Sequence, residues 1–262
     1  MLAADALVDL AFRDPAIVES SGLVVRDGLF VTTNDSGDSG RIFTVDASGA
    51  TVGVTSWPTA PTDVEALAPA AGRYVWVGDI GDNTASRASV TVMRVPFGTG
   101  DRTVTPPAYS LVYPDGAHDA ETLLAAPDGR LLVVSKNLFG GAVYAAPRHL
   151  SASEPNELTR VTRTMGFVTD GAFFPDGRQY VLRDYRTAAV YTYPGNERVA
   201  SFRLPDQQQG EGIAVDEGGW VHVSSEGVHS KVLRVVSVSV WGWLSGFVEE
   251  AARLLPGDGG AA

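Results

Sequence analysis

Cysteine is absent from this chain of 262 residues. Its absence excludes disulfides, thiolate catalysis, and zinc or iron–sulfur sites with cysteine ligands. Positive charge is also scarce, because 20 Lys and Arg stand against 31 Asp and Glu, which gives a formal net charge of −11. Nucleic-acid binding needs clustered Lys and Arg to neutralise phosphates. The composition therefore argues against a nucleic-acid partner.

Several functional signatures are missing as well. The sequence has no GxSxG elbow, HExxH pair or P-loop, so no catalytic residue can be assigned from a motif. Residues 1–10 have neither the basic segment nor the long apolar run of a signal peptide, and they leave the cellular location open. The apolar run at 235–248 is too short to span a bilayer, which makes membrane contact an unfavoured expectation.

A repeated pattern organises what the chain does contain. A β-rich segment, a polar loop, an acidic residue and a small or apolar run recur five times, with the acids separated by 46, 56, 49 and 41 residues. Strand-rich repeats of this length are typical of propeller blades. The acids that mark the repeat are Glu19, Glu65, Glu121, Asp170 and Glu211.

Each unit divides into four strand signals. After Glu121, apolar runs flank a turn at Asp128-Gly129, and such dipeptides between apolar runs are typical of hairpins. The fifth unit shows three strands, and residues 6–12 can supply its outer strand and remove exposed sheet edges. We therefore predict an all-β, five-bladed β-propeller over residues 1–238 that is closed by its N-terminal strand. Two stacked β-sandwiches are the alternative.

The repeated acids suggest a cation site. In a propeller, each acid would lie where its innermost strand enters the central channel, so the five would form a ring. Carboxylates this close cannot all ionise without a counter-charge, and Ca²⁺ tolerates irregular cages of oxygen ligands. The sequence therefore predicts Ca²⁺ bound by the ring. The alternative is that each acid accepts hydrogen bonds from backbone N–H groups and ties the blades together.

Loops between the second and third strands of each unit should open on the same face. They are rich in polar side chains, which suit either a small polar ligand or ordinary Asx turns. His118 precedes the third acid and is a weaker candidate for acid–base chemistry. The candidate ligand-binding residues are Asn34, Asp35, Asp38, Asp79, Asp82, Asn83, His118, Lys136, Arg183 and Glu226.

Several loop motifs resemble a known family. The motifs are ESSGL (19–23), NDSGDSGR (34–41), VGDIGDN (77–83), HDAE (118–121), VTDGAF (168–173) and QGEGIA (209–214). They are similar to those of actinobacterial, WD40-like β-propeller proteins, most of which are uncharacterised and usually exported. More distantly, the chain resembles phytase-like, calcium-dependent propellers. The resemblance implies a propeller fold, a location at the cell envelope or outside the cell, and central acids that bind Ca²⁺.

Two functions from different classes follow from these features. The favoured one is a binding or scaffold module that takes a small polar ligand or a protein partner on its acidic face. The alternative is a Ca²⁺-dependent phosphoesterase or esterase, in which metal-activated water is the nucleophile and Lys136 or Arg183 stabilises the anion.

The last segment has a different pattern. From Trp243 to Leu255, apolar residues recur at spacings of three and four, which predicts a short amphipathic helix within residues 239–262. Such a helix could dock on the propeller, meet a partner or lie on a membrane. Glu249 and Glu250 on the polar face disfavour anionic lipid, so docking is the expectation. The oligomeric state stays open.

Overall fold

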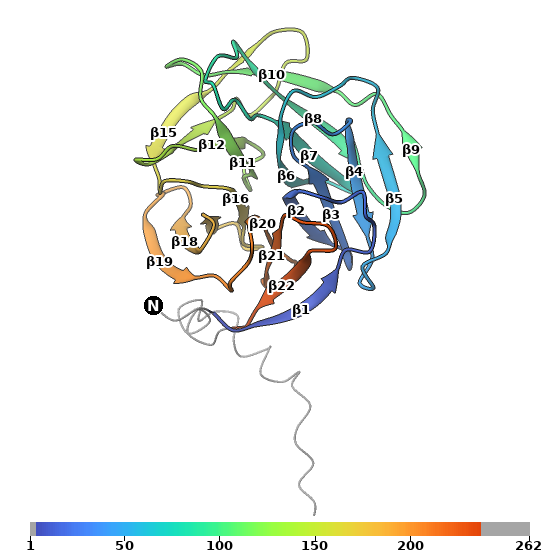
Figure 1. Ribbon diagram of the computed structural model, residues 1–262. Coiled ribbons are helices and arrows are strands. Elements are labelled where there is room, and N and C mark those ends of the chain that lie inside the picture. The colour runs from blue at the N-terminus through green and yellow to red at the C-terminus, as the bar shows by residue number, and fades with distance from the viewer. Residues whose placement is uncertain (1–3, 237–262) are drawn as a thin grey trace, which may run out of the picture.

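The computed structural model describes residues 4–236, which form five sheets arranged around a central channel (Figure 1). In each sheet the strands run outward from the centre in chain order, except that β1 (Ala6–Ala11), the first strand, is the outermost strand of the fifth sheet. This part of the chain contains no α-helix, and within it no helix is long and apolar enough to cross a membrane. The prediction of an all-β, five-bladed propeller is confirmed. The helix predicted for 239–262 lies outside the described residues.

The first two blades have the same plan. Each has four antiparallel strands in the order predicted from the sequence, plus a short parallel strand that the sequence pattern did not predict. Blade 1 consists of β2 (Ser20–Arg26), β3 (Leu29–Asn34), β4 (Arg41–Val45), β5 (Thr51–Ser56) and the short β9 (Arg102–Thr103). Blade 2 consists of β6 (Val64–Ala70), β7 (Tyr74–Asp79), β8 (Val90–Pro96), β10 (Ala108–Val112) and the short β14 (Asn156–Glu157).

The next two blades have four antiparallel strands each. Their apolar runs are short and separated by Asp-Gly turns, which is why each run forms one strand of a hairpin. Blade 3 consists of β11 (Ala120–Ala125), β12 (Leu131–Ser135), β13 (Ala142–Ala145) and β15 (Thr159–Arg163). Blade 4 consists of β16 (Asp170–Phe173), β17 (Gln179–Arg183), β18 (Thr187–Thr192) and β19 (Arg198–Arg203).

Blade 5 joins the two ends of the described chain. It consists of β20 (Gly210–Val215), β21 (Val221–Ser225), β22 (Lys231–Val235) and the N-terminal β1 (Ala6–Ala11). The first strand pairs antiparallel with β22, with Ala6 opposite Val235 and Ala11 opposite Lys231. The prediction that an N-terminal strand completes the last blade is confirmed. The pairing covers the outer edge of β22.

A buried histidine reinforces this closure. The imidazole of His222 on β21 has Nδ1 2.7 Å from an oxygen of Asp9 on β1 and Nε2 3.0 Å from an oxygen of Asp216. The other oxygen of Asp9 lies 3.2 Å from Nε of Arg234 on β22. Polar side chains of β1, β21 and β22 are therefore linked where β1 pairs with β22.

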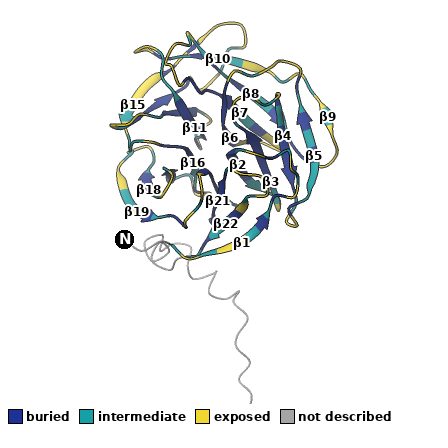
Figure 2. Cartoon of the chain, in the orientation of Figure 1, coloured by how far each residue is buried: buried dark blue, intermediate teal, exposed yellow. Residues whose placement is uncertain are grey.

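The core lies between neighbouring blades. Leu132 and Val134 of blade 3, for example, share a buried cluster with Tyr180 and Leu182 of blade 4. The inner strands are buried almost throughout, whereas exposed residues gather on outer strands and loops (Figure 2). Burial against both neighbours explains why inner strands read as apolar runs without strict alternation.

Candidate functional site

The five innermost strands β2, β6, β11, β16 and β20 all begin at the same end of the channel, here called the mouth. Because the second strand of each blade runs antiparallel to the first, its C-terminal end lies at the mouth too. Two sets of polar residues that are far apart in the sequence therefore meet there, as predicted.

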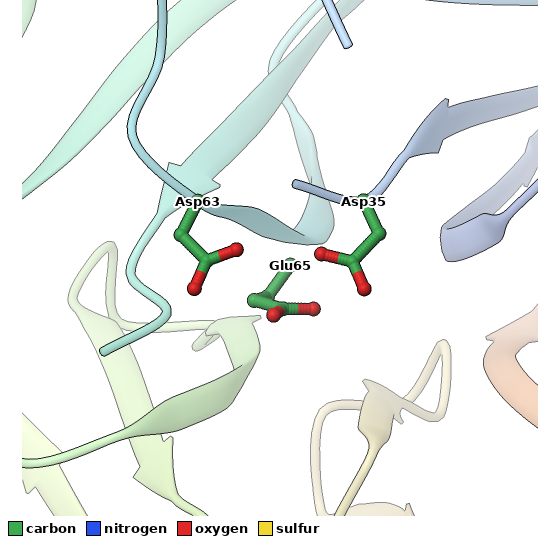
Figure 3. A group of neighbouring side chains, drawn as sticks. All are labelled: Asp35, Asp63 and Glu65. Atoms are coloured by element: carbon green, nitrogen blue, oxygen red, sulfur yellow. The ribbon is translucent and has the colours of Figure 1, made fainter. Parts of the chain in front are cut away.

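Three carboxylates gather at one side of the mouth. Asp35 follows β3 of blade 1, Asp63 precedes β6 of blade 2, and Glu65 lies within β6. One oxygen from each lies within 4.8 Å of the others (Figure 3). The three side chains point toward a common centre. We call them the acidic triad. Oxygen atoms at such spacing can hold a metal ion, and hard cations such as Ca²⁺ bind carboxylate oxygens.

The acidic triad has little compensating positive charge, because Arg87 lowers the pKa of Asp63 without cancelling the effects of burial and like charge. Burial raises the pKa of Asp63 to about 6, and the carboxylates of Asp35 and Asp119 add to the rise. Burial also raises the pKa of Glu65 strongly, with a further contribution from Glu121. Among residues 4–236, buried Oδ1 of Asp63 has no hydrogen-bond partner. A carboxylate in this condition binds either a proton or a cation.

A lysine balances the next acid around the mouth. Nζ of Lys136, directly after β12, lies 2.5 Å from Oε1 of Glu121 on β11 and 3.2 Å from the hydroxyl of Tyr185. Burial still leaves the pKa of Glu121 above its ordinary value, although the ammonium lowers it. Lys136 thus lies at the mouth as predicted and is paired with one of the predicted acids.

Glu211 and Glu226 form an acidic group on blade 5. The side-chain amide of Gln209 donates to Oε1 of Glu226 at 2.5 Å and to Oε1 of Glu211 at 3.4 Å. Burial, followed by the charges of Glu211 and Glu19, raises the pKa of Glu226 to about 7. Within the described part of the chain, buried Oε2 of Glu211 has no hydrogen-bond partner. Negative charge is therefore in excess here also.

Asp170 is fully buried and ties blades together. Its carboxylate accepts hydrogen bonds from the backbone N–H of Gly171 at 2.7 Å and of Ile213 in blade 5 at 2.8 Å. This arrangement is the backbone tie considered as the alternative to a metal ring. Burial raises the pKa of Asp170, and these N–H groups oppose the rise.

Arg183 lies beside Asp170 in the interior. Its residue exposure is 0%, and its guanidinium donates to backbone oxygens of Gly212 and Asp184 and to the side chain of Gln207. The structure therefore places this predicted anion-binding residue below the surface of the mouth, where it joins blade 4 to blade 5.

Glu19 lies at the rim, outside the position that the other four acids share. It precedes β2 and makes an isolated bridge to Glu226. The residue of blade 1 that faces Glu65 is Ser21, whose hydroxyl donates to Oε2 of Glu65 at 3.1 Å. The regular spacing of acids in the sequence did not reveal this shift, because Glu19 is the nearest acid.

The two other candidates near Asp35 hold the loop of blade 1. The side-chain oxygen of Asn34 accepts from the backbone of Val18 and Glu19, and its amide donates to Asp38 at 2.7 Å. Asp38 also pairs with Arg41 at 2.8 Å. These contacts position the loop that carries Asp35.

Blade 2 shows the same division of roles. Asp79 accepts from the backbone of Thr62 and Asp63 and pairs with Arg87 at 2.9 Å. Asp82 accepts from the backbone of residues 86 and 87, while Asn83 is exposed. Asp79 therefore fixes the backbone from which Asp63 projects.

His118 lies apart from the triad in a local network. Its Nε2 is 3.0 Å from Oδ1 of Asp115 and 2.9 Å from the hydroxyl of Tyr144. The ring also contacts Tyr113 edge-on at 5.1 Å between centroids. These contacts stabilise the loop before β11.

Four residues at or beside the mouth were not predicted from the sequence: Asp63, Asp119, Tyr185 and Gln209. The first two had a visible signal, because Asp-x-Glu occurs at 63–65 and again at 119–121. In an extended strand, residues two apart point to the same side, so each pair presents two carboxylates together. Tyr185 and Gln209 had no comparable signal, since their positions depend on loop conformation.

Comparisons with known proteins support the fold and go no further. No protein-family model matches the chain, and no curated protein matches it in sequence. A crystal structure of glutaminyl cyclase from Myxococcus xanthus is similar, with a TM-score of 0.55 and 13% identity over 88% of this chain and 97% of that one. A glucose dehydrogenase structure has a TM-score of 0.52 and 11% identity over 89% of this chain and 99% of that one. At such identities the likeness shows the propeller fold alone.

Proposed function

We propose that this protein is a binding module whose channel mouth holds a divalent cation, Ca²⁺, in the acidic triad and takes a small polar ligand or a protein partner on the same face. The observation that carries the proposal is the meeting of Asp35, Asp63 and Glu65 from two blades within 4.8 Å. The raised pKa values of Asp63 and Glu65 and the unpaired Oδ1 of Asp63 support it, because a cation would relieve both.

The ligand set favours Ca²⁺ among common cations. All three side chains of the triad offer oxygen, which hard cations prefer over the nitrogen and sulfur ligands typical of zinc sites. The triad is irregular and draws on a loop, a strand entrance and a strand. Ca²⁺ accepts such geometry more readily than Mg²⁺, which demands a near-octahedral set.

Binding is better supported than hydrolysis. A phosphoesterase or esterase needs a positive group that is free to stabilise the developing anion. Arg183 is buried and donates its hydrogen bonds within the protein, and Lys136 is already paired with Glu121. The low-identity likeness to two enzymes adds no argument for catalysis.

Calcium titration of chelator-treated protein tests the proposal. A ligand that binds the folded state at a hundred times its Kd stabilises it by about 2.7 kcal/mol, which corresponds to a rise in Tm of roughly 5–10 °C for a domain of this size. We expect Ca²⁺ to produce such a rise in the wild type and a much smaller one in Asp63→Asn. The matched control is Asp46→Asn, in the β4–β5 turn at the opposite end of the blade.

Either of two results would reject the cation site. One is a Tm that does not respond to Ca²⁺ after chelation. The other is an equal response in Asp63→Asn and Asp46→Asn, which would place any bound cation elsewhere. Mg²⁺ at the same concentration separates a selective site from general screening of acidic charge.

A further inference from the structure

An apolar surface lies beside the acidic mouth. The loop between β12 and β13 exposes Leu138 by 58% and Phe139 by 91%, and the segment before β16 exposes Phe167 by 44%. Large apolar side chains are normally exposed singly, whereas adjoining ones mark interaction sites. We call Leu138, Phe139 and Phe167 the apolar patch.

The apolar patch is built into the fold. The backbone N–H of Phe167 donates to the carbonyl of Asn137 at 3.2 Å, and the side chain of Asn137 accepts from the N–H of Phe139 at 3.0 Å. Phe167 has a φ of 52°, a left-handed conformation that is unfavourable for a bulky residue. The fold thus holds an exposed aromatic ring at a strained backbone position, which is a pattern common at binding sites.

The chain segment that carries the patch also reaches the acids of the mouth through Lys136. Lys136, the residue before Asn137, reaches Glu121 at the channel entrance and Tyr185 on the neighbouring blade. Tyr185 is itself 36% exposed. Blades 3 and 4 therefore place apolar and aromatic surface at the edge of the mouth.

A groove lies on the other side of the mouth, over blade 5. Its volume is about 330 Å³, and it runs between the loop at 206–208 and the β21–β22 loop at 226–230. Glu226 lies in its wall together with Val228 and His229, and the charged side chains of Asp206 and Lys231 line the groove as well. Glu226 faces the like charges of Glu211 and Glu19, and Oε2 of the deeply buried Glu211 has no hydrogen-bond partner within residues 4–236. A positively charged group in the groove would relieve this repulsion.

We propose that the mouth face binds an extended peptide segment that carries both a lysine or arginine and apolar residues: the basic side chain pairs with Glu226, and apolar residues further along the peptide pack on Phe139 and Phe167. The inference rests on the proposed function in one respect, the use of the mouth as a ligand-binding face. It adds the chemistry of the partner.

Charge decides among the possible occupants of this face. An anionic membrane would be repelled by the carboxylates of the mouth, although the exposed phenylalanines alone would suit a lipid surface. A second copy of the chain would bring another acidic mouth and a net charge of −11. A basic and apolar peptide complements both the patch and the acids.

Selection from a displayed library of random peptides tests the proposal on the full chain in the presence of Ca²⁺. We expect the bound pool to be enriched in peptides that combine Lys or Arg with aromatic or aliphatic residues at separate positions. A labelled peptide of the enriched consensus should bind Phe139→Ser and Glu226→Gln about tenfold more weakly than wild type, as is typical of residues at the centre of an interface. Val161→Ser on the outer strand β15 and Glu217→Gln in the β20–β21 turn are the matched controls, and both should bind like wild type.

Three outcomes would overturn the inference. The first is a bound pool with no enrichment, or with enrichment that lacks basic residues. The second is equal binding by wild type, Phe139→Ser and Glu226→Gln. The third is that arginine amide or spermidine binds as tightly as the peptide and without dependence on Phe139, which would make this a site for a small cation.

The calcium response of the same preparation separates this inference from the proposed function. If Ca²⁺ raises the Tm but no peptide is selected, the peptide site is wrong and the cation site stands. If a basic peptide is selected but Ca²⁺ has no effect on Tm, the acidic triad is not a cation site and the peptide surface stands.

Discussion

Asp170 and Glu65 stand at nearly the same place in two blades, at the channel end of an innermost strand, and their surroundings differ sharply. Asp170 accepts two backbone hydrogen bonds at 2.7 and 2.8 Å, and Arg183 lies near it in the interior. Glu65 receives a hydroxyl hydrogen bond from Ser21 and otherwise faces the charges of Glu121, Asp35 and Asp63. Asp170 thus has several hydrogen-bond donors and a cation nearby, whereas Glu65 has one donor and several like charges around it.

This difference distinguishes a repeated acid with a structural role, such as Asp170, from one that is a candidate for function, such as Glu65. Backbone donors and a nearby guanidinium oppose the rise that burial causes in the pKa of Asp170, so they offset part of the cost of burying its charge. A group of carboxylates without such partners destabilises the fold until it takes up protons or a cation. The repeat placed an acid in four blades, and the local donors decide what each one does.

The largest expected effect comes from replacing the carboxylate of Asp170 by an isosteric amide, compared with the same change at Glu65. Asp170→Asn directs an NH₂ group at a backbone N–H and removes one of the anions that face Arg183, so we expect a loss of about 3 kcal/mol of unfolding free energy. Glu65→Gln removes repulsion and should be neutral or slightly stabilising in chelator. Urea unfolding of the two variants measures both. Equal losses in the two variants would contradict the comparison.

Acidity should produce the next largest effect in the metal-free protein. The folded pKa of Asp63 is raised to about 6 and that of Glu226 to about 7, above ordinary unfolded values near 4. An acid with a raised folded pKa is destabilising when ionised, so this cost is absent below about pH 4 and complete above about pH 7. We therefore expect the Tm in chelator to rise as the pH is lowered from 8 to 5.5.

The same scan in Ca²⁺ provides the control. Protons and the cation compete for the acidic triad, so Ca²⁺ should stabilise most at pH 8 and least at pH 5.5. In Asp63→Asn the rise on acidification should shrink in chelator. A Tm in chelator that falls steadily from pH 8 to 5.5 would contradict this expectation, because acids with raised folded pKa values stabilise the fold as they take up protons.

The smallest expected effect concerns Lys136, whose blade lies between the blades of Glu65 and Asp170. Lys136→Met removes the ammonium beside Glu121 and leaves the mouth more negative. We expect Ca²⁺ to bind roughly three to ten times more tightly, with a larger gain at low ionic strength. Isothermal titration calorimetry at two salt concentrations measures this, with Lys231→Met on β22 as the matched control. Unchanged affinity would place the cation beyond the influence of Lys136.

Much of the fold was predictable because each sequence repeat contains the same pattern of apolar runs and turn residues, and this pattern determines the strands. Apolar runs hinged on Asp-Gly turns gave the strands, and the missing outer strand of the fifth unit indicated closure by residues 6–12. The additional parallel strands β9 and β14 were not predictable. Each has only two residues and is defined by pairing with a distant strand rather than by a local pattern.

The sequence predicted where the candidate site lies better than it predicted which residues form it. Spacing placed Glu65, Glu121, Asp170 and Glu211 at the channel entrances, but it could not distinguish an acid with backbone donors from one without them. Glu19 illustrates the limit, because Ser21 occupies the position facing Glu65. Asp35 was a candidate for its loop, whereas its partnership with Asp63 required the geometry of two blades.

The pairing of β1 with β22 also sets the order in which the molecule can be completed. The ribosome makes residues 6–11 well before their partner strand, which ends at Val235 more than 200 residues later. Throughout that interval the first strand has no sheet to join, and the growing assembly has an open flank. A polypeptide released before β22 is made would keep both unpaired edges exposed to aggregation and proteolysis. The edge of β1 is therefore covered only in a chain that extends through β22.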